Sequence, residues 1–208
     1  TDINLRYHEN SEKYYDPDKT LYSKEKTALH IAVQLKNSSI VKSLLDSADI
    51  DVNIKYINST SYKMFFRSYY NLTSFDLEEK TALHIAIEQN DTEIVRLLLA
   101  KSSIDVNAKW TYTHDAYAWQ SPMKGKKSYY FYPTSSEIEK EKWEFKKDMS
   151  SSTAQEKTAL HIAVQMGNIE IIKLLLNNEN IDIKAKDSNG KIPIEYTNND
   201  EIISLLNE

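Results

Sequence analysis

Apolar residues recur along this chain in short stripes with helical spacing. In residues 40–45 the apolar side chains occupy positions i, i+1, i+4 and i+5, and equivalent stripes lie at residues 94–99 and 171–176. This spacing predicts α-helices with a broad apolar face. Because one neighbouring helix cannot cover so wide a face, the pattern indicates helices that are buried by stacking.

A second pattern precedes each stripe. The residues E-K-T-A-L-H-I-A occur at 25–32, 79–86 and 156–163, and a later Ile follows the motif Thr by 23 residues in every copy. We predict a unit of two short antiparallel helices, with the motif Thr as N-cap and the motif His in the first turn. These structural residues are Thr27 and His30, Thr81 and His84, and Thr158 and His161. One unit cannot bury its own apolar face, so the units are expected to stack into a solenoid.

The second copy shows the motifs of the unit most fully. Thr81-Ala82-Leu83-His84-Ile85-Ala86 opens it, Glu93-Ile94-Val95-Arg96-Leu97-Leu98-Leu99 follows, and Asp105-Val106-Asn107-Ala108 closes it. With these motifs the chain resembles the ankyrin repeat family. The resemblance implies β-hairpin fingers that point away from the helices, a concave binding face, and a motif His that is a structural hydrogen-bonding partner of the motif Thr. The expected fold class is an all-α repeat solenoid, an ankyrin repeat stack of helix-turn-helix units, with long β-hairpin finger insertions.

The repeat spacing predicts one domain of eight segments. They are a remnant of a preceding repeat (1–7), a first finger (8–24), repeat 1 (25–55), a second finger (56–78), repeat 2 (79–109), a third finger (110–155), repeat 3 (156–186) and a partial capping repeat (187–208). The first segment aligns with the end of repeat 1, so we expect the parent protein to continue upstream with more repeats. In the last segment Pro193 stands at the first helical position, where Pro is favoured.

Three of the fingers are enlarged. The distance from the turn Asn to the next motif Thr is 23 (4 to 27), 28 (53 to 81) and 51 (107 to 158) residues, against 8 from Lys184 to Ile192. The family's tight finger has a Gly two residues before the Thr, and here Glu25, Glu79 and Glu156 replace it. Only the short finger keeps it, as Gly190. An extended loop removes the demand for positive φ that a tight turn makes.

Aromatic residues are concentrated in these fingers. Every Trp and Phe, and every Tyr except Tyr196, lies between the repeat bodies. Aromatic runs in the second and third fingers, at 62–70, 128–132 and 143–146, predict prolonged hairpins, with a turn at 121–125. The first finger, from Tyr7 to Lys24, is shorter and more polar, which is also compatible with an irregular loop.

Two roles for the aromatic rings remain open. They could pair across strands and stiffen the fingers, or they could form a strip that binds a partner, since Tyr and Trp dominate interface hot spots. The candidate partner-binding residues are Phe65, Phe66, Tyr69, Tyr70, Trp110, Tyr112, Trp119, Tyr130, Phe131, Tyr132 and Trp143.

Composition excludes several chemistries. The chain has no Cys, which removes disulfides, thiolate nucleophiles and cysteine-ligated zinc and fits a reducing, cytoplasmic compartment. Its three Gly cannot build a dinucleotide-binding turn, a phosphate-binding loop or a nucleophile elbow. The motif histidines recur once per layer, too far apart to share a metal ion. We therefore expect that the chain has no catalytic, metal or cofactor site and that it is not an enzyme.

Charge and hydropathy limit the partners. The formal net charge is −5, which argues against a nucleic-acid surface, and no apolar run is long enough for membrane insertion. The expected function is a protein–protein interaction module that binds another protein through its concave face and aromatic fingers. One alternative is a regulatory segment of a larger enzyme or channel. A second alternative is stacking of the aromatic prongs on glycan rings or single-stranded nucleic-acid bases.

Overall fold

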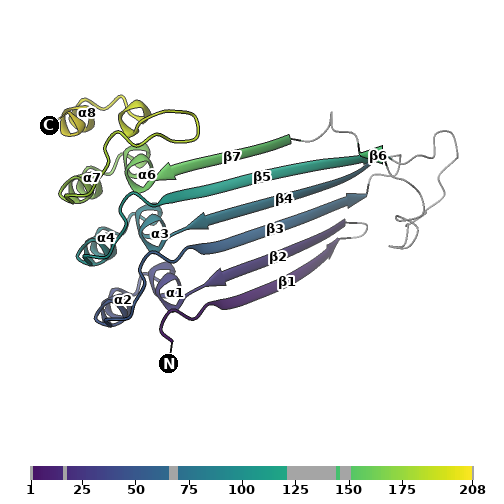
Figure 1. Ribbon diagram of the computed structural model, residues 1–208, viewed down its shortest axis with the longest axis horizontal. Helices are drawn as coiled ribbons and strands as arrows, with labels where there is room; N and C mark the ends of the chain where they lie inside the picture. Colours follow the sequence, from purple (N-terminus) through teal and green to yellow (C-terminus); the bar gives the residue numbers. More distant parts are fainter. Residues whose placement is uncertain (1, 16–17, 66–69, 121–143, 146–150, 208) are drawn as a thin grey trace, which may run out of the picture.

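The computed structural model describes residues 2–15, 18–65, 70–120, 144–145 and 151–207. In this part of the chain, three helix pairs lie at one end and a long sheet extends away from them (Figure 1). The pairs are α1 (Ala28–Gln34) with α2 (Ser38–Leu45), α3 (Ala82–Glu88) with α4 (Thr92–Leu99), and α6 (Ala159–Met166) with α7 (Ile169–Leu176). A short 3₁₀-helix, η2 (Pro193–Tyr196), and α8 (Asp200–Leu206) follow.

Local sequence sets the helix boundaries. The outer helices α2, α4 and α7 begin after Asn37, Asp91 and Asn168, whose side chains accept a hydrogen bond from the backbone N–H three residues later. The inner and outer helix of each pair are joined at a residue with positive φ, which reverses the chain. These residues are Lys36 (53°), Asn90 (57°) and Gly167 (71°). Helices this short are not stable alone, so packing must hold them.

The helices stack in two layers. Inner helices α1, α3 and α6 contact one another next to the sheet, and outer helices α2, α4 and α7 contact one another behind them (Figure 1). Ile94 and Ile171 are 0% exposed between successive pairs, whereas the equivalent Ile40 of the first pair is 48% exposed. The preceding repeat therefore supplies the burial of each of these side chains, and full burial of such a residue contributes about 1.5 to 3 kcal/mol.

The segments between the helix pairs form a single antiparallel sheet. In the described residues it has seven strands in the order β1-β2-β3-β4-β5-β6, with β7 also paired to β5. The strands are β1 (Tyr7–Tyr15), β2 (Asp18–Lys26), β3 (Tyr56–Phe65), β4 (Tyr70–Lys80), β5 (Lys109–Gln120), β6 (Glu144–Phe145) and β7 (Ser151–Thr158). The all-α class expected from the sequence is wrong, because this sheet is as much a part of the fold as the helices.

Pairing between neighbouring segments explains the difference. Residues 19–25 of β2 pair with residues 57–63 of β3, and residues 70–79 of β4 pair with residues 111–120 of β5. Each hairpin alone would expose unpaired backbone groups along its outer strands. Pairing with the neighbouring hairpin satisfies these groups. The first segment, for which the sequence also allowed an irregular loop, forms β1 and β2 and takes part in the same sheet. The turn predicted at residues 121–125 lies outside the described residues.

A ladder of asparagines links the repeats. Each of these asparagines lies shortly before β1, β3 or β5. Asn4, Asn53 and Asn107 each donate their Nδ2 to a backbone oxygen of the next repeat and accept a backbone N–H from it through Oδ1. The distances are 2.6 to 2.8 Å for the donated bonds and 2.8 to 2.9 Å for the accepted ones. Lys184 stands at the equivalent position after the third repeat. Each asparagine therefore fixes the height of one repeat above another.

Candidate interaction surface

The base of the sheet has one face that is tied to the inner helices. The lysine before each motif Thr reaches back to the C-terminal part of an inner helix. Lys26 Nζ lies 3.1 Å from Gln34 Oε1, Lys80 Nζ lies 2.7 Å from Glu88 Oε2, and Lys157 Nζ lies 2.8 Å from Gln165 Oε1. We call the sheet face that carries these lysines the inner face and the opposite one the outer face.

A stacked pair of aromatic rings lies on the inner face. Trp110 lies directly opposite Lys157, and Tyr112 lies directly opposite Glu78. Directly opposite residues of antiparallel strands share a face, as do residues two apart on one strand. The ring centroids of Trp110 and Tyr112 are 6.4 Å apart with an angle of 13° between the planes. Both side chains are half-buried, and Trp110 also packs against the helical core.

Two carboxylates of β4 hold these rings in place. Trp110 Nε1 donates a hydrogen bond of 3.1 Å to Glu78 Oε1, and the Tyr112 hydroxyl donates one of 2.9 Å to Asp76 Oδ1. The same Asp76 oxygen lies 2.6 Å from His114 Nδ1. We call these five residues the ring–carboxylate cluster. Because both rings are tethered at their polar atoms, the cluster is organised before any ligand arrives.

Lys80 connects this cluster to the helices. Its Nζ lies 3.0 Å from Glu78 Oε1 and 2.7 Å from Glu88 Oε2, and its side chain is only 13% exposed. Burial disfavours the charged ammonium, but the bonds to Glu88 and Glu78 outweigh this effect and raise the pKa of Lys80 above its ordinary value. The ammonium is therefore firmly charged, and it fixes β4 to the end of α3.

The outer face carries one ion pair in each enlarged finger. The acidic residues of the three pairs are those that replace the Gly of a tight finger, namely Glu25, Glu79 and Glu156. Arg6 Nη1 lies 3.0 Å from Glu25 Oε2, Lys55 Nζ lies 3.2 Å from Glu79 Oε2, and Lys109 Nζ lies 2.6 Å from Glu156 Oε2. A strand needs no positive φ, so the position accepts a side chain, whereas Gly190 in the short finger has φ +78°.

Comparison with known families identifies the repeats. The family described as Ankyrin repeat matches the sequence at residues 24–56, 78–110 and 155–188. The chain contains three ankyrin repeats. Ankyrin repeats are generally non-catalytic, and their presence indicates a protein–protein interaction module. A search of curated proteins finds no match.

Each ankyrin repeat has a threonine–histidine pair at the start of its inner helix. Thr27 Oγ1 lies 2.8 Å from His30 Nδ1, and the Thr27 backbone N–H donates to the same nitrogen at 3.1 Å. The second and third ankyrin repeats have the same bonds. Burial lowers the pKa of His30 to about 4 and that of His84 to about 3, and it also lowers that of His161. These histidines are neutral, with Nδ1 as an acceptor.

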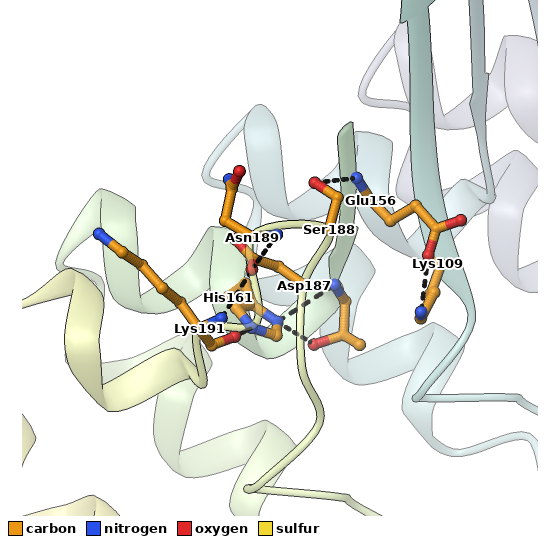
Figure 2. Close-up of polar contacts among 8 residues, drawn as sticks. Lys109, Glu156, His161, Asp187, Ser188, Asn189 and Lys191 are labelled. Atoms are coloured by element: carbon orange, nitrogen blue, oxygen red, sulfur yellow. Dashed lines mark hydrogen bonds and ion pairs between the residues drawn. The ribbon is translucent and has the colours of Figure 1, made fainter. Parts of the chain in front are cut away.

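The short finger after the third ankyrin repeat is built around Asp187 (Figure 2). Its Oδ1 accepts the backbone N–H groups of Asn189 and Lys191, both at 2.8 Å, and its Oδ2 accepts the Tyr196 hydroxyl. Burial favours the neutral acid, but the bond from Tyr196 and the two backbone donors outweigh it and lower the pKa of Asp187. The carboxylate thus shapes the tight turn that the enlarged fingers lack.

This turn also covers part of the free edge of β7. The Ser188 backbone N–H donates to the Glu156 carbonyl, and the Glu156 backbone N–H donates to Ser188 Oγ, both at 3.3 Å (Figure 2). Lys109 pairs with the Glu156 side chain on the other strand. The base of β7 is therefore bonded to the short finger along one edge and to β5 along the other.

The predicted partner-binding residues fall into three groups. Trp110 and Tyr112 lie together in the ring–carboxylate cluster. Phe65, Tyr70 and Trp119 lie on strands near the far end of the sheet, where Asn71 is opposite both Phe65 and Trp119, and Gln120 is opposite Tyr70. Phe66, Tyr69, Tyr130, Phe131, Tyr132 and Trp143 lie outside the described residues.

Sequence reasoning missed Asp76, Glu78 and His114. Alternation along β5 could have placed His114 on the same face as Trp110 and Tyr112, because the three residues are two apart. The carboxylates carried no such signal, since they precede Trp110 by more than thirty residues and meet it only through the register between β4 and β5.

The described residues contain neither a group of three metal-ligating side chains nor a helix of the length and hydropathy that crossing a membrane requires. In this part of the chain, the chemistry of the cluster is thus limited to hydrogen bonding, charge and aromatic contact.

Proposed function

We propose that this chain binds a segment of another protein in the corner between the inner face of the sheet and the inner helices. The single observation that supports this most directly is the Trp110–Tyr112 pair. Two half-buried rings stack on the inner face and are tethered to carboxylates, so they offer a large contact area at small entropic cost. Aromatic residues of this kind dominate the binding energy of protein interfaces.

The geometry gives no support to the nucleic-acid alternative. In a nucleic acid, each nucleotide whose base stacks on an aromatic ring also carries a phosphate. Binding therefore requires cations beside the rings. Here Asp76 and Glu78 flank the rings, and the ammonium groups of Lys26 and Lys157 are bound to Gln34 and Gln165. The groups bonded to the rings are therefore carboxylates, which repel phosphate.

A pair of matched variants tests the proposal. Tyr112→Ala removes a ring from the inner face, and Phe75→Ala removes a ring that is 37% exposed on the outer face. Both proteins and the wild type are first compared by circular dichroism and thermal unfolding. Cell extract is then passed over each immobilised protein, and the dissociation constant of the most enriched protein is measured with purified components.

We expect Tyr112→Ala to weaken that binding by about tenfold or more, the loss typical of a hot-spot residue. Phe75→Ala should leave it unchanged. Hydrogen–deuterium exchange of the complex should show protection in β4 and β5 and in the inner helices. Equal binding by wild type and Tyr112→Ala, or loss only with Phe75→Ala, would contradict a partner site on the inner face.

A further inference from the structure

The two carboxylates of the ring–carboxylate cluster each use a single oxygen for bonding. Asp76 accepts the Tyr112 and His114 bonds through Oδ1, and Glu78 accepts the Trp110 and Lys80 contacts through Oε1. Among the described residues, Asp76 Oδ2 and Glu78 Oε2 accept no hydrogen bond. The two side chains are 24% and 23% exposed, so both are partly open to solvent.

The charged groups in direct contact with the rings are carboxylates. Trp110 is bonded to Glu78 and Tyr112 to Asp76, while Lys80 bonds both Glu78 and Glu88. The neighbouring Lys26 and Lys157 direct their ammonium groups to helix glutamines, and Lys157 also lies over the Tyr196 ring at 4.9 Å. On β1 and β2, Glu9 and Lys24 lie directly opposite each other. The charges that are hydrogen-bonded to the ring pair itself are therefore negative.

From this arrangement we propose that the partner segment is basic and places an arginine side chain on the ring–carboxylate cluster. A guanidinium is flat, stacks on aromatic faces and donates several N–H groups in one plane. Half-exposed rings beside two carboxylates with accepting oxygens match all three properties. A lysine ammonium would satisfy the charge but not the planar stacking, so it fits less well. The inference rests on the proposed function, because it names the chemistry of the partner at that site.

Short labelled peptides serve as probes for the full 208-residue chain. One peptide alternates arginine with glycine, a second replaces arginine by lysine, and a third replaces it by glutamate. Fluorescence anisotropy gives the affinities, and the indole N–H signal of Trp110 in a nitrogen–proton correlation spectrum, assigned with Trp110→Phe, reports contact at the cluster.

The arginine peptide should bind about tenfold or more tightly than the glutamate peptide, with the lysine peptide between them, and should shift the Trp110 signal. The double variant Asp76→Asn/Glu78→Gln keeps the size of both side chains and should weaken the arginine peptide by about fivefold or more. Glu93→Gln removes one negative charge from an exposed position on α4 and should have no effect. Glu78→Asp, which keeps the charge, should retain most of the binding.

Arginine and glutamate peptides of equal affinity, or an equal loss with Glu93→Gln, would overturn the inference. The two proposals fail separately. A captured partner that depends on Tyr112 but binds Asp76→Asn/Glu78→Gln as tightly as wild type leaves the inner-face site in place and refutes the basic segment. A partner that is insensitive to Tyr112→Ala refutes the site itself.

Discussion

Asn53 Oδ1 accepts the backbone N–H of Asp105 at 2.8 Å, although the two residues are 52 positions apart and belong to successive repeats. The same side chain donates Nδ2 to the Ser103 carbonyl at 2.8 Å. One amide group thus satisfies two backbone groups of the next repeat. Because Asn4 and Asn107 make equivalent bonds, the repeats are held at a fixed offset along the whole stack.

Replacing Asn53 by Ala should therefore loosen the stack. The Ser103 carbonyl and the Asp105 N–H, both on exposed residues, lose their partner, and the loss of these two hydrogen bonds should lower the free energy of unfolding by about 1 to 3 kcal/mol. Chemical denaturation followed by circular dichroism measures the change. Asn10→Ala, at an exposed position of β1, is the control and should change stability by no more than about 0.5 kcal/mol. An equal effect of the two substitutions would contradict the role of the ladder.

Exchange at the equivalent positions Glu79 and Gly190 should be destabilising at both, for different backbone reasons. Gly190 has φ +78° with open space where a Cβ would be, so Gly190→Ala should cost about 1 to 2 kcal/mol from backbone strain alone. Glu79 lies in a strand, where Glu79→Gly should cost about 0.5 to 1 kcal/mol from the added freedom of the unfolded chain.

Glu79→Gln separates the charge from the backbone in the same series. The Lys55–Glu79 pair is about one-third exposed, so its loss should cost less than about 1 kcal/mol. Denaturation midpoints of the three variants test the set. A stabilising Glu79→Gly, or a neutral Gly190→Ala, would show that the enlarged and short fingers do not differ in their backbone requirement.

Acidification should destabilise the repeats well before the carboxylates titrate. Burial lowers the folded-state pKa of His30 to about 4 and of His84 to about 3, while an unfolded histidine titrates near 6.5. The unfolded chain therefore binds more protons over this range. The stabilising contribution is complete above pH 6.5 and is lost as pH falls toward 4 and then 3, at up to about 1.4 kcal/mol per pH unit for each histidine.

The slope of unfolding free energy against pH measures this effect directly. We expect a steep positive slope from pH 4.5 to 6.5 in the wild type and a smaller one in His30→Gln/His84→Gln. The comparison of slopes is independent of the stability that the double variant loses with its capping bonds. A wild-type stability that is flat over this interval would contradict neutral, buried histidines.

The helical part of the structure could be predicted from the sequence because its signals are local. The motif Thr, the motif His three residues later and the apolar stripe that follows lie within one repeat, and each acts over one or two helical turns. Gly190 and Pro193 marked the tight finger and the start of η2 in the same way. The family match then agrees with a pattern that is already complete in a single unit.

The sheet and the ring–carboxylate cluster could not be predicted in this way. Pairing between β4 and β5 depends on two segments that a whole helix pair separates, and a shift of one residue would turn every side chain to the other face. Trp110 could be proposed as a binding residue from its type alone. Glu78 and Asp76 became its partners only when the register was known, because acidic residues in a polar strand have no distinguishing pattern.

The continuous sheet also restricts how this protein can change in length. Because neighbouring strands share their backbone hydrogen bonds, an insertion of one residue inside β3 or β4 would reverse the faces beyond that point and mismatch both adjacent strands at once. Growth and shortening are tolerated at the tips, where a strand can extend past its neighbours. We therefore expect the inter-repeat segments to be constrained in length near the helices and free to vary only at their distal ends.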